Sequence, residues 1–282
     1  MKHFSQSGMI VRRFLRHRMA VVCLVILLVL IVMAVLAPVI APYSPTKPSG
    51  KFSEGPTKEH VLGTDKIGRD MYSRILYAMR VSLEVGFLAT MLSTVIGVVL
   101  GLVSGYFGGW IDKAIMSVTD MVMSFPYILL VLVAAAIFEP GKWSIILILG
   151  FVDWPGVARL VRGNVLSLRE TNFIKGDVVS GMPRRYILFS EILPNTIAPV
   201  LVYATSVFAI SILDEAALSF LGMGVQPPTP SLGNLLNGAE SLSVLTGKPW
   251  LWVPAGLVII VLVCCINFVG DALRDAFDPR NE

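Results

Sequence analysis

Long stretches without a charged residue dominate the pattern of hydrophobic and polar positions along this chain. An α-helix rises about 1.5 Å per residue, so roughly 20 apolar residues cross a hydrocarbon core of about 30 Å. Five uncharged runs have about this length or more, and they predict five transmembrane helices. These runs cover residues 19–46, 85–111, 121–138, 192–213 and 249–270.

A sixth, weaker span is predicted between Trp143 and Leu160, where Asp153, Trp154 and Pro155 interrupt an apolar run. The first run, which follows four arginines, also raises the alternative of a cleaved signal peptide. A signal peptide has an apolar region of about 7 to 15 residues, and residues 19–41 form a longer one. We therefore expect an uncleaved first helix.

The composition agrees with a membrane protein. Hydrophobic residues make up 55% of the chain and charged residues only 15%, which leaves too few charges to coat a soluble domain. The net charge is +4 and no basic face is clustered, so no nucleic-acid partner is expected. The three cysteines lie inside apolar runs and do not form a disulfide framework.

Six spans place both termini on the same side of the membrane, and the positive-inside rule selects the side. With the N-terminus inside, the inner segments hold 14 of the 23 basic residues. The opposing residues 42–80 hold seven, diluted by four acids in a loop long enough to be partly folded. Both termini are therefore expected to be cytoplasmic.

Two kinds of residue stand out inside the spans. Small residues at four-residue spacing line one helix face and allow another backbone to approach, within this chain or from a second membrane subunit; these are Ser93, Gly97, Gly101 and Gly105. Charges at membrane depth are costly and normally face a bundle interior or an aqueous cavity. Four acids are therefore candidates for a pathway, although each could instead pair with a basic neighbour: Asp120, Asp153, Asp214 and Glu215.

The segment from Arg159 to Asn195 is the longest polar stretch on the expected inner side. Asn172 is predicted to cap a short helix from Phe173, and a turn at residues 181–183 is predicted to precede a second helix near Arg184. An apolar stripe on the first helix indicates a partner surface, with a plain solvated loop as the alternative. The stripe comprises Phe173, Ile174, Val178 and Val179.

Motifs for enzymatic chemistry are absent from the sequence. The pair Gly141-Lys142 lacks the other glycine of a phosphate-binding loop, so this chain is not expected to hydrolyse ATP. The three histidines are isolated and the cysteines lie in apolar runs, so no metal site is expected. No nucleophile and base arrangement is visible, and we expect no catalytic residue and no cofactor bound by this chain.

Three long motifs resemble one family. They are residues 60–70 with 73–83 (HVLGTDKIGRD and SRILYAMRVSL), residues 215–234 (EAALSFLGMGVQPPTPSLGN) and residues 267–279 (NFVGDALRDAFDP). These motifs and the six-span layout are similar to ABC transporter permeases, specifically the C-type subunit of dipeptide, oligopeptide and nickel importers, and the likeness covers nearly the whole chain.

The resemblance implies an all-α integral membrane protein with six transmembrane helices, the type I ABC importer permease fold, and a cytoplasmic coupling helix. It implies a bacterial or archaeal cytoplasmic membrane, a homologous permease, an extracytoplasmic binding protein, and two ATPase subunits that carry ATP and Mg. We expect residues 1–80 to hold the N-terminal cytoplasmic segment, first span and extracytoplasmic loop, residues 81–272 the core permease domain, and residues 273–282 a cytoplasmic tail. The coupling loop is expected at residues 163–195.

The family's coupling loop carries Glu-Ala-Ala with a glycine four residues later, and here the matching positions read Lys175, Gly176, Asp177 and Gly181. The glycine is kept and the three-residue signature is lost. We hypothesise a matched groove on the partner ATPase. The expected coupling residues are Phe173, Ile174, Lys175, Gly176, Asp177, Val178, Gly181 and Tyr186.

The resemblance predicts import of short peptides, with nickel or a metal chelate as the alternative cargo. A self-sufficient secondary transporter is the competing class, supported by the break at Asp153 and Pro155. A membrane scaffold without transport is a third class, which would leave the coupling loop and the pathway acids unexplained.

Overall fold

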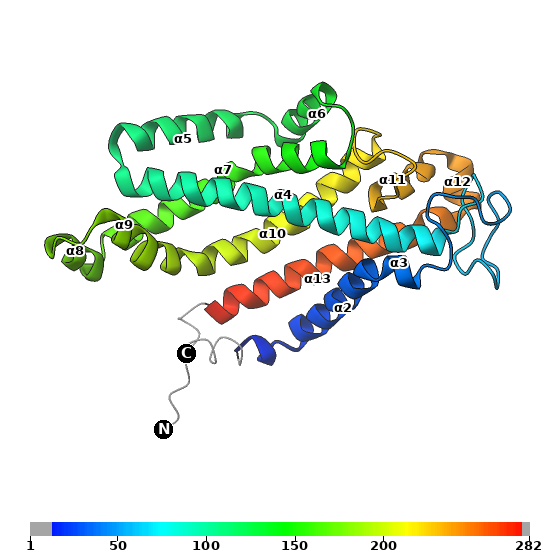
Figure 1. Cartoon of the computed structure of the whole chain (residues 1–282), viewed down its shortest axis with the longest axis horizontal. Coiled ribbons are helices and arrows are strands. Elements are labelled where there is room, and N and C mark those ends of the chain that lie inside the picture. The colour runs from blue at the N-terminus through cyan, green and yellow to red at the C-terminus, as the bar shows by residue number, and fades with distance from the viewer. Residues whose placement is uncertain (1–12, 278–282) are drawn as a thin grey trace.

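A computed structural model describes residues 13–277, so Lys2, Arg12, Arg280 and the end of the expected cytoplasmic tail lie outside the described residues. Long helices run roughly parallel to one axis of the molecule (Figure 1). Within the described part, regular structure is helical apart from an isolated bridge between Thr64 and Asp70. The helices are α2 (Arg18–Val35), α3 (Ala37–Ile40), α4 (Met71–Phe107), α5 (Gly109–Ser124), α6 (Tyr127–Ile137), α7 (Lys142–Arg169), α8 (Asn172–Val179), α9 (Arg184–Tyr186), α10 (Leu193–Phe220), α11 (Leu232–Leu236), α12 (Leu242–Gly247) and α13 (Val253–Phe277), with a π-helical turn at Ile187–Ile192 and 3-10 turns at Asn237–Glu240 and Pro249–Leu251.

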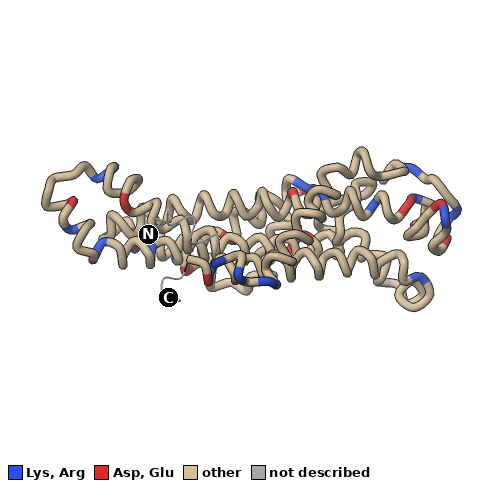
Figure 2. The backbone as a smooth tube through the Cα atoms, turned by 90° about the horizontal axis from the view of Figure 1, so that it is seen from below, with Lys and Arg blue, Asp and Glu red and all other residues tan. Residues whose placement is uncertain are grey.

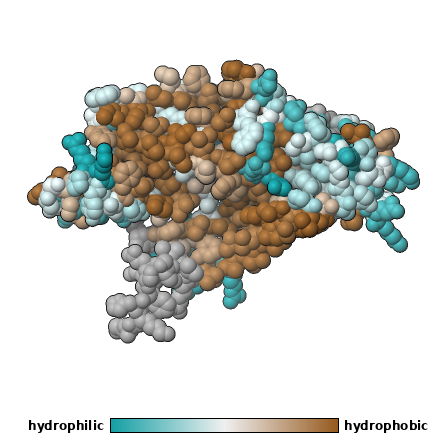
Figure 3. Space-filling model, in the orientation of Figure 1, coloured by the Kyte–Doolittle hydropathy of each residue, from teal (hydrophilic) through white to brown (hydrophobic). Residues whose placement is uncertain are grey.

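Within residues 13–277, five helices are long and apolar enough to cross a membrane, and there are six if the bent pair α5 and α6 is counted as one span. Many charged residues lie toward the two ends of the long axis (Figure 2), and a broad hydrophobic band separates hydrophilic ends (Figure 3). This arrangement confirms the predicted all-α architecture with up to six membrane-spanning segments.

The second span begins earlier than the charge pattern predicts. Asp70 caps α4 by accepting a hydrogen bond from the Ser73 amide at 2.8 Å, so the helix starts at Met71 instead of near residue 85. The charge pattern missed this first part of the helix because it contains Arg74, Arg80 and Glu84. The expected domain boundary at residues 80 and 81 therefore falls inside α4, and the one at 272 and 273 falls inside α13.

The segment formed by α5 and α6 is broken, whereas α7 is continuous. The axes of α5 and α6 differ by 90° across Phe125 and Pro126. Proline disfavours helical geometry at the preceding residue, and Phe125 accordingly adopts extended backbone angles. By contrast, α7 continues through Pro155, so the predicted interruption of that span is wrong.

The packing of α4 against α7 forms the centre of the molecule. A Cβ atom added to Gly97 would lie 2.5 Å from Val157 Cβ, and one added to Gly105 would lie 2.7 Å from Val165 Cβ. Ser93, on the same face, is fully buried. The row of small residues therefore packs inside this chain, which selects the first of the two alternatives.

The two ends of the molecule are built from different segments. The helices α8 and α9 lie at one end, and residues 42–70, α11 and α12 lie at the other (Figure 1). The described start and end of the chain lie toward the first end, where His17 Nε2 is 3.8 Å from Asp275 Oδ2. The segments expected to be cytoplasmic and those expected to be extracytoplasmic are thus separated by the hydrophobic band.

Candidate coupling segment and membrane pathway

The helix α8 ends in a Schellman motif, which fixes the turn that the sequence predicts at residues 181–183. The Met182 amide donates to the Asp177 carbonyl and the Gly181 amide donates to the Val178 carbonyl. Gly181 has a φ of +73°, a left-handed conformation that favours glycine. The start differs from the prediction, because Thr171 occupies the N-cap position and Asn172 is the first helical residue.

The predicted apolar stripe on α8 is divided between two surfaces. Ile174 is only 2% exposed and packs in a cluster with Val165, Ile187 and Ile192, so its assignment to an exposed stripe is wrong. Phe173, Val178 and Val179 remain exposed, as does Tyr186 in α9. Ile174 therefore anchors α8 to the membrane domain, and its neighbours present an apolar surface outward.

The three residues that depart from the family signature lie at this surface. Lys175 Nζ is 2.9 Å from Glu170 Oε2, and this ammonium lowers the pKa of the Glu170 carboxyl. A Cβ added to Gly176 would meet no atom within 4 Å, so packing does not require glycine there. Lys175 and Gly176 are exposed, and Asp177 is partly exposed.

Beneath α8 lies a cavity of about 670 Å³ that reaches the end of α4. Tyr106, Ile174 and Arg184 are among the residues that line it. Arg169 also lines it and donates from Nη1 to the Gly105 carbonyl at 2.9 Å, which joins the end of α7 to the end of α4. The coupling segment is thus connected directly to the central helix pair.

Two ion pairs connect α5 to α7. Arg162 donates from Nε and Nη2 to both carboxylate oxygens of Asp112, at 2.6 and 2.7 Å. Arg159 donates to Asp120 at 2.6 Å, and both of these side chains are at least half exposed. Asp120 therefore pairs with a basic neighbour, which is the alternative that the sequence left open for the pathway candidates.

A second group of polar residues lies beside the break between α5 and α6. The Tyr127 hydroxyl donates to Asp214 Oδ2 at 2.5 Å. Asp153 Oδ2 is buried without a hydrogen-bond partner among the described residues. Tyr127, Asp153 and Tyr203 line a cavity of about 230 Å³. Two of the four pathway candidates thus lie around one tyrosine, because Tyr127 binds Asp214 and lines the cavity together with Asp153.

Glu215 is separated from this group and has a different environment. Its side chain is completely buried and accepts hydrogen bonds from Ser82 at 2.5 Å and from Ser219 at 2.7 Å. Ser82 also accepts a hydrogen bond from the Leu232 amide. Glu215 therefore joins α10, α4 and α11 inside the protein.

Several of these residues were not found from the sequence. Tyr127 and Tyr203 were missed because a tyrosine in an apolar run gives no signal by itself. Arg162 and Asp112 are 50 positions apart, and only the antiparallel packing of α5 and α7 brings them together. The sequence Ser-Phe-Pro at residues 124–126 did carry a signal for the break, since proline restricts the residue before it.

Comparisons with known proteins define the class. Residues 97–282 match the family described as binding-protein-dependent transport system inner membrane component, and residues 5–56 match the N-terminal TM domain of oligopeptide transport permease C. The first match covers more than half of the chain. The chain belongs to the inner membrane components of binding-protein-dependent transport systems, and it is an ABC importer permease.

The alignments with named relatives cover most of the chain. It is 40% identical over 238 residues to the dipeptide transport system permease protein DppC of Alkalihalophilus pseudofirmus, which covers 84% of this chain and 77% of that protein. It is 38% identical over 271 residues to the glutathione transport system permease protein GsiD of Pectobacterium atrosepticum, covering 95% and 89%. An inward-facing crystal form of the MetNI methionine ABC transporter shares the fold, with a TM-score of 0.58, 19% identity, and coverage of 74% of this chain and 98% of that chain.

Proposed function

We propose that this chain is one of two permeases of an ATP-driven importer that takes up short peptides. The assignment of peptides as the cargo rests on the identity of about 40% to permeases named for dipeptide and glutathione transport. Glutathione is itself a tripeptide. Membership in a binding-protein-dependent family supports an extracytoplasmic delivery protein and separates the chain from the secondary-transporter class. We place it in a bacterial or archaeal cytoplasmic membrane, in complex with a homologous permease and two ATPase subunits that bind ATP and Mg.

The proposed orientation places both termini and α8 in the cytoplasm. Phe173, Val178, Val179 and Tyr186 dock on an ATPase, and Ile174 transmits the movement of α8 to the membrane domain. ATP binding closes the two ATPases and biases the permease pair toward the outward-open state, and hydrolysis resets it. This is alternating access between two states of a helix bundle, driven by energy from another chain.

Copurification tests this assignment. The chain is tagged at its C-terminus, extracted from native membranes in mild detergent, and its partners are identified and counted by mass spectrometry. We expect one homologous permease and two ATPase subunits per tagged chain. Uptake of labelled dipeptides by cells that carry or lack the chain then tests the cargo, with nickel uptake as the comparison. A lone chain or a homodimer without an ATPase would contradict the proposal.

The matched-groove hypothesis predicts the effect of restoring the family signature. The double variant Lys175→Glu with Gly176→Ala should lower substrate-stimulated ATP hydrolysis by about threefold, which corresponds to about 0.7 kcal/mol. It removes the ion pair to Glu170 and places two carboxylates side by side at the docking surface. The single variant Gly176→Ala serves as the control, because open space surrounds that position. Higher stimulated turnover in the double variant would overturn the hypothesis.

We assign Asp153 and Asp214 to the translocation pathway, because Asp153 lines the cavity and Tyr127, which also lines it, binds Asp214. Hydrogen bonds to a charged group contribute about 1.5 to 3 kcal/mol, so Asp214→Asn is expected to lower peptide uptake about tenfold. ATP hydrolysis stimulated by the binding protein should persist, because the coupling segment is unchanged. Asp120→Asn is the matched control, since its ion pair is exposed and contributes little. Equal uptake in the two variants would remove Asp214 from the pathway.

A further inference from the structure

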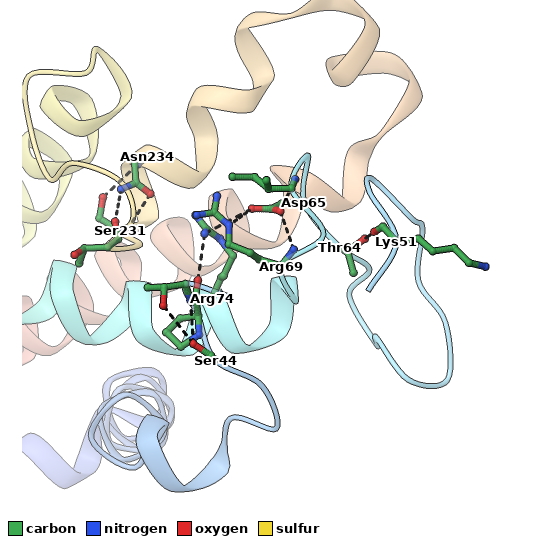
Figure 4. Close-up of polar contacts among 12 residues, drawn as sticks. Ser44, Lys51, Thr64, Asp65, Arg69, Arg74, Ser231 and Asn234 are labelled. Carbon is green, nitrogen blue, oxygen red and sulfur yellow. Dashed lines mark hydrogen bonds and ion pairs between the residues drawn. The ribbon is translucent and has the colours of Figure 1, made fainter. Parts of the chain in front are cut away.

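A pocket of about 290 Å³ lies at the end of the molecule opposite the coupling segment. It is formed between the loop before α4, the start of α4 and the segment around α11. Figure 4 shows the contacts of Asp65, Arg69 and Arg74, with Ser231 and Asn234 on a neighbouring segment. The residues lining the pocket include Asp65, Lys66, Arg69, Arg74, Asn234 and Leu251.

The pocket contains one carboxylate and three basic side chains. Asp65 Oδ1 accepts the amides of Ile67 and Arg69, both at 2.9 Å, and this carboxylate is therefore fixed by the loop itself. Asp65 Oδ2 lies 2.6 Å from Arg69 Nε and 3.6 Å from Arg74 Nη1. One carboxylate is thus shared by two guanidinium groups, and Lys66 adds a third positive charge. The described side chains that line the pocket leave an excess of two positive charges.

Arg74 is the deepest of these groups. The residue is only 5% exposed, and its one further hydrogen bond runs from Nη1 to the Pro45 carbonyl at 3.3 Å. Its Nε atom is buried and contacts no acceptor among the described residues. Buried donors are nearly always paired, so this edge of the guanidinium is suited to an acceptor that enters the pocket from outside. Asn234, which also lines the pocket, does not pair with Arg74 Nε, and its side-chain oxygen accepts the Ser231 amide.

The chemistry of the pocket selects a carboxylate. A guanidinium binds a carboxylate through two parallel N–H···O bonds, and the exposed Lys66 at the mouth attracts negative charge before contact. Ile67, beside Lys66, is 51% exposed and adds an apolar side chain next to this basic residue. We propose that this pocket binds an Asp or Glu side chain of the extracytoplasmic binding protein.

This proposal rests on the function proposed above, and the two can be tested separately. The complete transporter is reconstituted in nanodiscs, and its affinity for the copurifying binding protein is measured by surface plasmon resonance. Arg74→Lys keeps the charge but loses the fork of donors, and we expect at least tenfold weaker binding, mainly from faster dissociation. Lys66→Gln should weaken binding about threefold, mainly by slowing association at low salt. Lys58→Gln, an equal charge change on the same loop outside the pocket, should alter binding less than twofold.

Basal ATP hydrolysis without the binding protein reports on the fold of each variant and should stay at the wild-type rate. Neutralising the acidic surface residues of the binding protein one at a time should then identify one carboxylate whose loss is not additive with Arg74→Lys. Unchanged binding by folded Arg74→Lys and Lys66→Gln complexes would overturn the carboxylate pocket while leaving the importer assignment intact. The pocket would instead be assigned to the cargo by a different result. In that case the pocket variants would keep their affinity for the binding protein, and they would lose more uptake of free peptides than of peptides with a C-terminal amide. If the wild-type complex binds no such protein, both proposals fail.

Discussion

Glu215→Ala is expected to destabilise the folded protein by about 3 kcal/mol or more, because it breaks a completely buried polar network. Ser82 and Ser219 both donate to this carboxylate, and each would lose its acceptor in the interior. A buried donor without a partner costs about 1 to 3 kcal/mol, and the lost side-chain volume adds to this. The measurement is the thermal midpoint in detergent, which should fall by about 6 to 12 °C.

The matched variant is Glu215→Gln, which preserves the shape of the side chain. Its amide oxygen still accepts one serine hydroxyl, and its NH2 group donates to the other serine oxygen. We expect a midpoint within about 4 °C of the wild type and normal peptide uptake. Loss of uptake in a stable Glu215→Gln protein would contradict the structural role and return Glu215 to the set of pathway residues.

Charge-free runs predicted most of the spans because a charge at membrane depth is costly. The same rule obscured the start of α4, where Arg74, Arg80 and Glu84 belong to a helix that extends beyond the hydrophobic band. The sequence pattern also predicted an interruption at Pro155 and none at Pro126, which is the reverse of the structure. Pro155 lies inside a continuous helix, whereas Pro126 follows an extended residue at a 90° bend. Proline alone does not decide between these outcomes, since packing around the helix does.

The candidate sites were only partly visible in the sequence. The turn at Gly181 followed from local backbone chemistry, and the structure confirms it. The burial of Ile174 depends on Ile187 and Ile192, which return to it only after that turn. Adjacent acids also separate in space, because Asp214 contacts Tyr127 while Glu215 contacts Ser82. Neighbouring residues on a helix point in different directions, so sequence proximity could not assign their roles.

Gly101→Ala tests the central contact between α4 and α7. A Cβ atom at this position would lie 2.6 Å from the Ala158 carbonyl oxygen and 2.7 Å from Val161 Cβ. The carbonyl belongs to the backbone of α7, so the clash can be relieved only by moving the two helices apart. Overpacking of this kind costs about 1 to 3 kcal/mol. We expect a lower thermal midpoint and reduced uptake, because Arg169 would also be pulled away from the Gly105 carbonyl.

Gly163→Ala provides the matched control on α7. The chemical change is the same, but a Cβ at Gly163 would meet no atom within 4 Å, and alanine favours the helix by about 1 kcal/mol. Its thermal midpoint should equal or exceed that of the wild type. Adding Val161→Ala to Gly101→Ala should recover only part of the loss, since the Ala158 carbonyl remains in place. Equal midpoints for Gly101→Ala and Gly163→Ala would show that α4 and α7 do not pack closely at this position. Full recovery of the midpoint in the double variant would show that the clash is with the Val161 side chain instead of the backbone.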